Sequence, residues 1–224
     1  MKKSLIALAF GTLGLGIAEF VMMGILPDVA SDLKISIPAA GHFISAYALG
    51  VCVGAPVLTL ARKYPLKHIL LVLVTLIMVG NICAALSPNY WMLLISRFIS
   101  GLPHGAYFGV GSIVAARVAG PGRSAQAVAV MIAGMTVANL FGVPLGTLVS
   151  HLLSWRALFC IAGVWGAVTA FFLWRWVPWM EPVADSRGLK GSSPSCGIGR
   201  RGSSSWRRCS VMAVSSACTV TSAR

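Results

Sequence analysis

The chain has 224 residues, of which 57% are hydrophobic and only 10% are charged. A water-soluble domain carries about 25% charged residues, so this composition excludes an ordinary soluble protein and indicates a chain embedded in a lipid bilayer. The net charge of +13 is compatible with a nucleic-acid partner, but the positions of the charges along the chain argue against one.

Six apolar runs follow one another, each about as long as a membrane-spanning helix requires. They lie at about residues 4–27, 39–60, 69–86, 91–114, 125–150 and 157–177. The first run is too long for the apolar core of a signal peptide, so we expect it to be retained as a span. The expected fold is an all-α membrane protein, a six-helix transmembrane bundle over residues 1–178. A basic, Ser-rich tail over residues 179–224 is expected to be disordered.

Lysine and arginine gather at alternate ends of the expected spans. With a cytoplasmic N-terminus, the inner flanks hold Lys2, Lys3, Arg62, Lys63, Lys67, Arg117, Arg123 and Arg175, and the outer flanks hold only Lys34 and Arg156. This asymmetry follows the positive-inside rule. It predicts a multi-pass protein of a bacterial-type inner (plasma) membrane with both termini in the cytoplasm, and it accounts for the basic charge without nucleic acid.

Two ionisable residues, Glu19 and Arg97, lie well inside spans, where such groups usually face a bundle interior or a hydrated cavity. If the first span ends near Ile25 and the fourth begins at Trp91, both side chains lie about 9 Å below the outer surface at about 1.5 Å per residue. We therefore expect Glu19 and Arg97 to pair or to share one hydrated cavity. The alternative is that Arg97 extends alone to the helix end.

The fourth span also contains His104, which lies two turns after Arg97 and on the same helical face. The ordinary pKa of imidazole is close to neutral, so His104 is a candidate proton carrier, although a hydrogen-bonded structural histidine fits equally well. Gly101 and Gly105 flank this face and allow a neighbouring backbone to approach closely. Asn139 adds a polar group to the fifth span.

Gly142, Pro144 and Gly146 predict a kinked, glycine-rich fifth helix, whose freed carbonyl groups need neighbours or water. Close-packed, kinkable helices around buried charges indicate a protein that moves to let a solute pass. The cysteines follow no CxxC pattern, so neither a zinc site nor another metal site is predicted.

Four stretches carry a family resemblance: "AEFVMMGILPDVA", "SIPAAGHFISAYALGVCVGAP", "RFISGLPHGAYFGVGSIVA" and "GMTVANLFGVPLGTLVSHLLSWRALF". In this order, over about residues 1–180, the chain resembles the major facilitator superfamily, in particular its proton-linked exporters and most closely the arabinose efflux permeases. The resemblance implies efflux of a sugar, a drug or another small solute. Because the sequence contains no phosphate-binding loop for ATP, a proton gradient is the expected energy source, and no cofactor is expected.

The resemblance also implies roles for individual residues. Arg97 and Gly101 match the fourth-span motif associated with proton transfer and cavity lining. Gly142, Pro144 and Gly146 match part of the fifth-span antiporter motif, which shapes the contact with the opposite half of the transporter. The translocation cavity would then be lined by Glu19, Arg97, His104 and Asn139.

Gly54, Arg62 and Lys67 fall on the family's loop motif between the second and third spans, which gates movement. The stretch "GAPVLTLARKYPLKH" lacks the acidic residue that most family members carry there. The resemblance therefore implies no charge relay at that position.

Length is the larger departure from the family, whose members bind substrate between two six-helix halves. This chain contains one half. We expect the N-terminal half of an exporter that is inactive without its missing C-terminal half. An alternative is a six-span protein that forms a functional transporter by homodimerisation.

A third alternative is a six-span intramembrane serine protease with Ser100 as nucleophile. Such an enzyme needs a glycine two residues before the serine, where this chain has Phe98, and a histidine at membrane depth, whereas His151 lies at a span end and His42 lies near one. Because the geometry of nucleophile and base comes first, we predict that the chain is not an enzyme.

Residues 190–224, rich in Ser, Cys and Trp, have a second explanation in the genetic code. A frame that starts at each third base places the first base of the following codon in the middle. Cys codons, Trp codons and most Ser codons begin with U, and a middle U encodes Phe, Leu, Ile, Met or Val. A gene segment that encodes an apolar helix would give such a Ser-, Cys- and Trp-rich tail if it were translated in the wrong reading frame. We therefore expect the chain to be a frameshifted product of a longer exporter.

Overall fold

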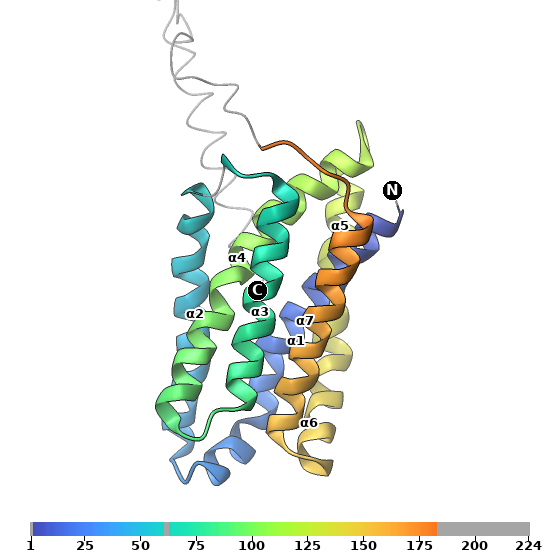
Figure 1. The fold of residues 1–224 in the computed structure, drawn as a ribbon. Helices are drawn as coiled ribbons and strands as arrows, with labels where there is room; N and C mark the ends of the chain where they lie inside the picture. Colours follow the sequence, from blue (N-terminus) through green and yellow to red (C-terminus); the bar gives the residue numbers. More distant parts are fainter. Residues whose placement is uncertain (1, 61–62, 183–224) are drawn as a thin grey trace, which may run out of the picture. The chain divides into compact units, whose positions relative to one another are not determined.

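The computed structural model describes residues 2–60 and 63–182, and these residues fold as helices joined by short turns (Figure 1). In chain order the helices are α1 (Lys2–Asp32), α2 (Ile37–Leu60), α3 (Leu66–Ala85), α4 (Tyr90–Ala119), α5 (Ser124–Val137), the π-helix η2 (Ala138–Gly142), α6 (Val143–Leu152) and α7 (Trp155–Trp176). Because α5, η2 and α6 are continuous, the described residues form six antiparallel rods. The expected six-helix bundle is confirmed. Arg62 and the tail from residue 183 onwards lie outside the described residues.

Five of these rods are long and apolar enough to cross a membrane by length and composition: α1, α2, α3, the rod made of α5 to α6, and α7. Among the described helices, α4 is the exception, since it carries Arg97 and His104 together with several serines and glycines. It packs against α1, α2, α3 and α5. The least apolar rod is therefore shielded by its neighbours.

Two helices begin at side-chain caps that the sequence encodes. The Asn89 side chain accepts a hydrogen bond from the Met92 amide at 3.0 Å at the start of α4, and Ser154 Oγ accepts one from the Ala157 amide at 3.2 Å at the start of α7. Both bonds satisfy amides that a helix N-terminus leaves free. At its other end, α4 stops at Gly120, whose φ of 76° suits glycine.

The first helix extends five residues beyond Pro27, where we expected the span to end. Three hydrogen bonds from other rods hold this extension. Asp28 Oδ2 accepts from Ser150 Oγ at 2.5 Å, and Asp32 Oδ2 accepts from Trp155 Nε1 at 3.1 Å. Arg156 Nη1 also donates to Asp32 at 2.5 Å. Tertiary contacts therefore outweigh the local tendency of proline to end a helix.

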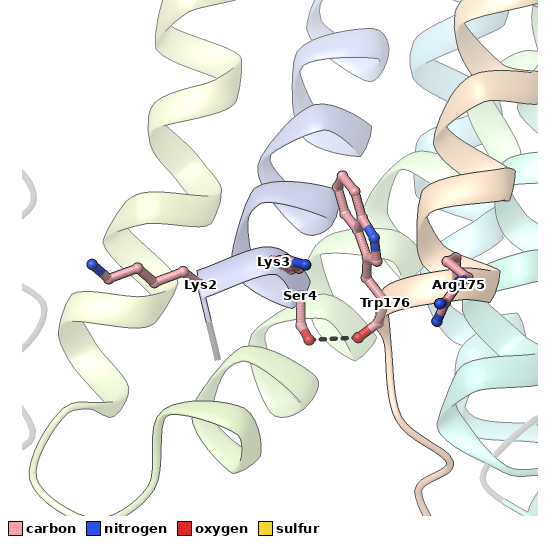
Figure 2. Close-up of a pocket in the computed structure, with 5 residues that line it drawn as sticks. All are labelled: Lys2, Lys3, Ser4, Arg175 and Trp176. Atoms are coloured by element: carbon pink, nitrogen blue, oxygen red, sulfur yellow. Dashed lines mark hydrogen bonds between the residues drawn. The ribbon is translucent and has the colours of Figure 1, made fainter.

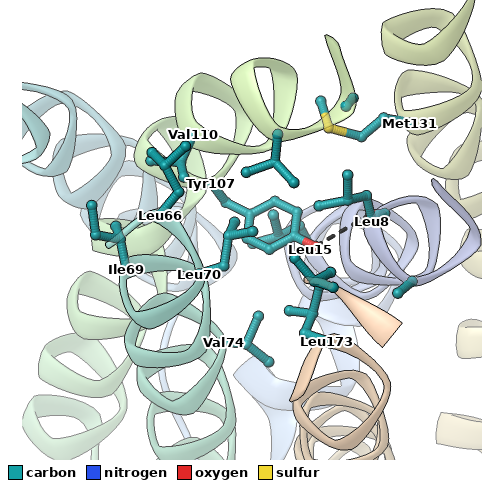
Figure 3. Packing of buried hydrophobic residues seen from close by; sticks show 14 of the residues in the cluster. Leu8, Leu15, Leu66, Ile69, Leu70, Val74, Tyr107, Val110, Met131 and Leu173 are labelled. Carbon is teal, nitrogen blue, oxygen red and sulfur yellow. Dashed lines mark hydrogen bonds between the residues drawn. The ribbon is translucent and has the colours of Figure 1, made fainter. Parts of the chain in front are cut away.

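The apolar core consists of two clusters, and α1 contributes to both. The cluster in Figure 3 includes Leu8, Leu70, Val110, Met131 and Leu173 around the ring of Tyr107. The Tyr107 hydroxyl donates to the carbonyl of Leu8 at 3.3 Å, so its polar end is satisfied within the core. The second cluster includes Met22, Ile25, Phe43, Leu93 and Phe159.

Helices α2 and α4 approach each other through glycines. A Cβ atom added to Gly54 would collide with the carbonyl oxygen of Leu102, and one added to Gly101 would collide with the carbonyl oxygen of Tyr47. Gly54 is buried within α2, inside the expected second span. Gly105 differs, because an added Cβ there would meet its nearest neighbour, Ala55 Cβ, at an ordinary 3.5 Å.

We predict that Gly101→Ala and Gly54→Ala each lower the stability of the bundle by about 1–3 kcal/mol, because the two backbones must separate to admit a methyl group. Gly105→Ala is the matched control. It should leave stability unchanged or slightly raised, since alanine favours helix more than glycine does. Thermal unfolding of the purified chain in detergent micelles measures the difference. Equal melting temperatures for Gly101→Ala and Gly105→Ala would contradict the close approach.

Candidate functional site

Polar side chains from three helices meet in the interior of the bundle. Helix α4 contributes Arg97 and His104, α2 contributes Tyr47, and α1 contributes Glu19. Arg97 is fully buried, and Tyr47 and His104 are 2% and 7% exposed. We call these four residues the central polar cluster.

Tyr47 links the two polar residues of α4. Its hydroxyl lies 2.9 Å from Nδ1 of His104, and the Arg97 guanidinium carbon lies 4.5 Å from the centre of its ring. The ring of Phe159 flanks the same guanidinium at 5.5 Å. His104 is stacked on Phe108 at 5.4 Å between ring centres. The cluster therefore places a cation on aromatic faces and an imidazole in a fixed orientation.

Glu19 faces His104 rather than Arg97. Its Oε2 lies 3.7 Å from Nε2 of His104, and the structure contains no direct ion pair between Glu19 and Arg97 within its described residues. The two charges belong to one cluster but are not in direct contact, so of the two expected arrangements the structure does not show the direct pair.

The position of the α1 end explains this change of partner. Helix α1 continues to Asp32, and α4 begins at Tyr90. At a rise of about 1.5 Å per residue, Glu19 lies about 20 Å below the end of α1. By the same rise, His104 lies about 21 Å below Tyr90, whereas Arg97 lies about 10 Å below it. Glu19 is therefore level with His104.

Arg97 is the residue whose burial is hardest to offset. Its Nε and Nη1 atoms have no hydrogen-bond partner among the described residues, and neither has Oε2 of Glu19. Aromatic faces attract a desolvated cation, so Tyr47 and Phe159 compensate part of the cost of removing the guanidinium from water. Full burial also rules out the alternative in which Arg97 extends to the helix end.

The fifth-span motif residues pack against α1. A Cβ on Gly146 would meet Val21 at 2.8 Å, and one on Gly142 would meet Ile17 at 3.0 Å. Pro144 is the second residue of α6, which begins where η2 ends. The proline ring has no amide hydrogen and crowds the carbonyl four residues earlier, which favours the wider π turn observed there. The expected kink therefore takes the form of a π-helix.

The remaining candidates lie away from the central polar cluster. Asn139 is exposed on η2. Lys67 Nζ donates to the carbonyl of Trp174 at 2.7 Å, which ties α3 to the end of α7. Ser100 Oγ donates to the carbonyl of Ser96 at 2.9 Å within α4. Ser100 thus has a structural role at this packed position.

The family model described as "Major Facilitator Superfamily" matches residues 8–221. The chain belongs to this superfamily. Its members are transporters rather than enzymes. The chain is 53% identical to the AraJ protein of Escherichia coli (strain K12) over 179 residues. This aligned region covers 80% of this chain and 45% of AraJ.

Two further relatives are more distant. The "Chloramphenicol resistance protein" of Streptomyces lividans is 32% identical over 84% of this chain and 48% of its own length. The "Probable sugar efflux transporter" of Helicobacter pylori (strain G27) is 32% identical over 78% of this chain and 44% of its own length. The chain therefore spans somewhat less than half the length of these relatives.

A solved structure of the peptide transporter POT in complex with sulfate shares the fold. The TM-score is 0.68 at 16% sequence identity, over 77% of this chain and 37% of that chain. The described helices therefore have the arrangement of part of that transporter's fold.

Tyr47, which connects the central polar cluster, is not among the site residues predicted from the sequence. Two signals were available. A tyrosine in an apolar span needs a partner for its hydroxyl. Phe43, Tyr47, Gly50 and Gly54 also follow helical spacing, which places Tyr47 on the same face as the glycines that approach α4.

We predict that Tyr47→Phe lowers the free energy of unfolding by about 1–3 kcal/mol, because Nδ1 of His104 loses its buried partner. Tyr47→Leu should cost clearly more, since the aromatic face beside Arg97 is lost as well. Thermal unfolding in detergent micelles compares the two variants. The difference between them should disappear in an Arg97→Leu background, and its persistence would show that Arg97 and the ring are not coupled.

Proposed function

We propose that the chain is one half, the N-terminal half, of a proton-coupled superfamily exporter for a sugar, a drug or another small solute. The observation that carries this proposal is the 3.7 Å approach of Glu19 and His104 at membrane depth, beside the buried Arg97. Ionisable groups are rare inside spans and usually belong to proton or substrate pathways. The names of the two distant relatives support a sugar or a drug as the solute.

The proton-coupling role rests on charge balance in the central polar cluster. Arg97 keeps its proton throughout, so the net charge of the cluster depends on Glu19 and His104. An ionised Glu19 balances Arg97 through the low-dielectric interior, and proton uptake by either Glu19 or His104 leaves the cluster with excess positive charge. The added positive charge favours a helix arrangement in which the cluster is more exposed to water. Proton uptake is thereby coupled to helix movement. The proton gradient then supplies the energy, without ATP or another cofactor.

The requirement for a second half rests on an uncovered apolar face. In the rod from α5 to α6, only 17% of the most apolar stretch is buried, against 33–50% in the other four apolar rods. Large exposed side chains on this rod are Val130, Ile132, Val137, Leu140, Phe141, Leu145, Leu148 and Leu152. The same rod carries Asn139 and the antiporter motif residues, so we assign this face to the contact with the opposite half. A homodimer through this face is the second candidate.

Transport by a split protein tests the function. The chain is reconstituted into liposomes with an imposed pH gradient, alone and together with the part of AraJ that it does not match. We expect uptake of a labelled sugar or of chloramphenicol only with both parts. Glu19→Gln should abolish acceleration by the pH gradient, whereas Glu181→Gln, a carboxylate outside the spans, should retain it.

Each other outcome of this experiment has a definite meaning. Transport by the chain alone would favour the homodimer. A folded pair of halves that moves no solute from a panel of sugars and drugs would contradict the exporter. Retention of pH-driven transport in Glu19→Gln would contradict the proton-coupling role while leaving the exporter intact.

The orientation of the bundle across the membrane is proposed from the unequal numbers of Lys and Arg residues at its two ends. The start of α1, the α2–α3 and α4–α5 connections and the end of α7 lie at one end of the bundle (Figure 1). Among the described residues this end has seven Lys or Arg residues, and the opposite end has Lys34 and Arg156. Both termini are therefore assigned to the cytoplasm of a bacterial-type cell.

Cysteine labelling in cells checks this orientation, in a background without native cysteines. Reporters that replace Lys34 and Asn89 should react with an impermeant reagent from outside. Reporters at Lys67 and Gly120 should react only after the membrane is permeabilised. The opposite pattern would reverse the proposed topology.

A further inference from the structure

A basic cavity lies where the start of α1 meets the end of α7. Its volume is about 450 Å³, and its lining consists of Lys2, Lys3, Ser4, Arg175 and Trp176 (Figure 2). Ser4 Oγ donates to the carbonyl of Trp176 at 2.7 Å. The two helix ends are therefore joined beneath the cavity, and its shape depends on packed secondary structure.

The positive charge of this cavity is uncompensated. Within the part of the chain that the structure describes, the side chains of Lys2, Lys3 and Arg175 form no hydrogen bond or ion pair. Other cations at this end do have partners: Lys67 donates to the carbonyl of Trp174 and Arg117 to that of Glu181. The contrast shows that the cations of this cavity, unlike their neighbours, have no protein counterion or acceptor among the described residues.

Acidic side chains do not supply that anion among the residues described. The whole sequence has five Asp and Glu residues. Glu19 lies in the bundle interior, and Asp28 and Asp32 lie at the opposite end of α1. Glu181 follows α7, and its exposed side chain forms no ion pair with the lining residues. Asp185 lies outside the described residues. The first turn of α1 contains no acidic residue, so its free amides add further positive potential.

Below the cavity, an aromatic seam runs along α1 and α7. Trp176 stacks on Phe172 with ring centres 4.3 Å apart, and Phe10 stacks on Trp165 at 4.0 Å. Phe10 and Phe172 join the two pairs at 5.6 Å. All four rings are half-buried, so one side of the seam remains open to an apolar partner.

The cavity and the seam together complement a phospholipid, because a basic site lies next to an apolar surface. Helices α1 and α7 are both apolar enough to cross a membrane, and the cavity lies where they end, at the level of lipid headgroups. Tryptophan is enriched at this level. Basic pockets between membrane helices bind anionic headgroups, and the seam below offers a surface for acyl chains.

We propose that the cavity between α1 and α7 binds the phosphate headgroup of an anionic phospholipid, with its acyl chains along the aromatic seam. Lys3 and Arg175 hold the phosphate from opposite helices, and Lys2 adds a further positive charge. A bound lipid of this kind joins the first and last spans of the bundle. This inference does not depend on transport activity, because it needs only the folded bundle in a membrane.

Lipid retention by the purified full chain tests the proposal. The chain is extracted in mild detergent, and bound phosphatidylglycerol or phosphatidylcholine is counted by native mass spectrometry at equal added concentrations. We expect phosphatidylglycerol to be retained selectively and to raise the melting temperature. Lys3→Gln combined with Arg175→Gln should weaken this retention about tenfold or more, since both charges face the headgroup.

The matched control is Lys63→Gln combined with Arg123→Gln, which removes two exposed cations from the same end of the bundle but outside the cavity. It should retain phosphatidylglycerol like the parent. An equal loss in both double variants would overturn a specific site and indicate diffuse attraction. Equal retention of the two lipids would also overturn it. Stabilisation by inorganic phosphate alone, equal to that by phosphatidylglycerol, would assign the site to free phosphate instead of lipid.

Discussion

The burial of the Arg97 guanidinium is the constraint on which the centre of the bundle depends. A cation in an apolar interior is costly unless polar or aromatic groups surround it. Gly101 stands one turn after Arg97, and its missing side chain leaves a notch against which the Tyr47 backbone lies. This notch brings the Tyr47 ring beside Arg97 and its hydroxyl to His104, one turn further on. The close α2–α4 crossing and the polar cluster are therefore one feature, because the glycine packing positions the tyrosine.

Helix α1 contributes Glu19, the third partner in this arrangement. Contacts at the outer end of α1 determine how deep Glu19 lies in the bundle. Asp28 and Asp32 receive hydrogen bonds from the end of α6 and the start of α7. These contacts fix the helix along its axis. A shift of one residue moves a side chain by about 1.5 Å along the helix and turns it by about 100°. The approach of Glu19 to His104 therefore depends on anchors about 14 and 20 Å away along α1. The outer end and the cluster are coupled through a single rigid element.

Sequence rules predicted the six-helix bundle and the inward direction of Arg97 and His104, because both follow from the cost of polar groups in lipid. They did not predict which charge Glu19 faces. The expected depth of Glu19 assumed that the first span ends before Pro27, a local rule, whereas contacts with distant residues extend the helix to Asp32. Tyr47 was missed for a related reason. Its importance comes from a backbone notch on another helix, and helix pairing cannot be inferred from the periodicity of one span.

Two features of the bundle indicate that it contacts a partner on the side of α1 and of the rod from α5 to α6. Nε and Nη1 of Arg97 and Oε2 of Glu19 lack hydrogen-bond partners among the described residues, although buried polar atoms usually have them. The rod from α5 to α6 leaves its apolar side uncovered, although large exposed apolar patches usually mark an interface. Helix α1 carries Glu19 and packs on this rod through Gly142 and Gly146. A second half seated on the rod would enclose α1 from the open side, and a solute or water held between the halves would reach Glu19, whose side chain is 30% exposed. One partner surface would then serve Glu19 and cover the apolar rod, which is why we favour a two-half transporter over an independent six-helix protein.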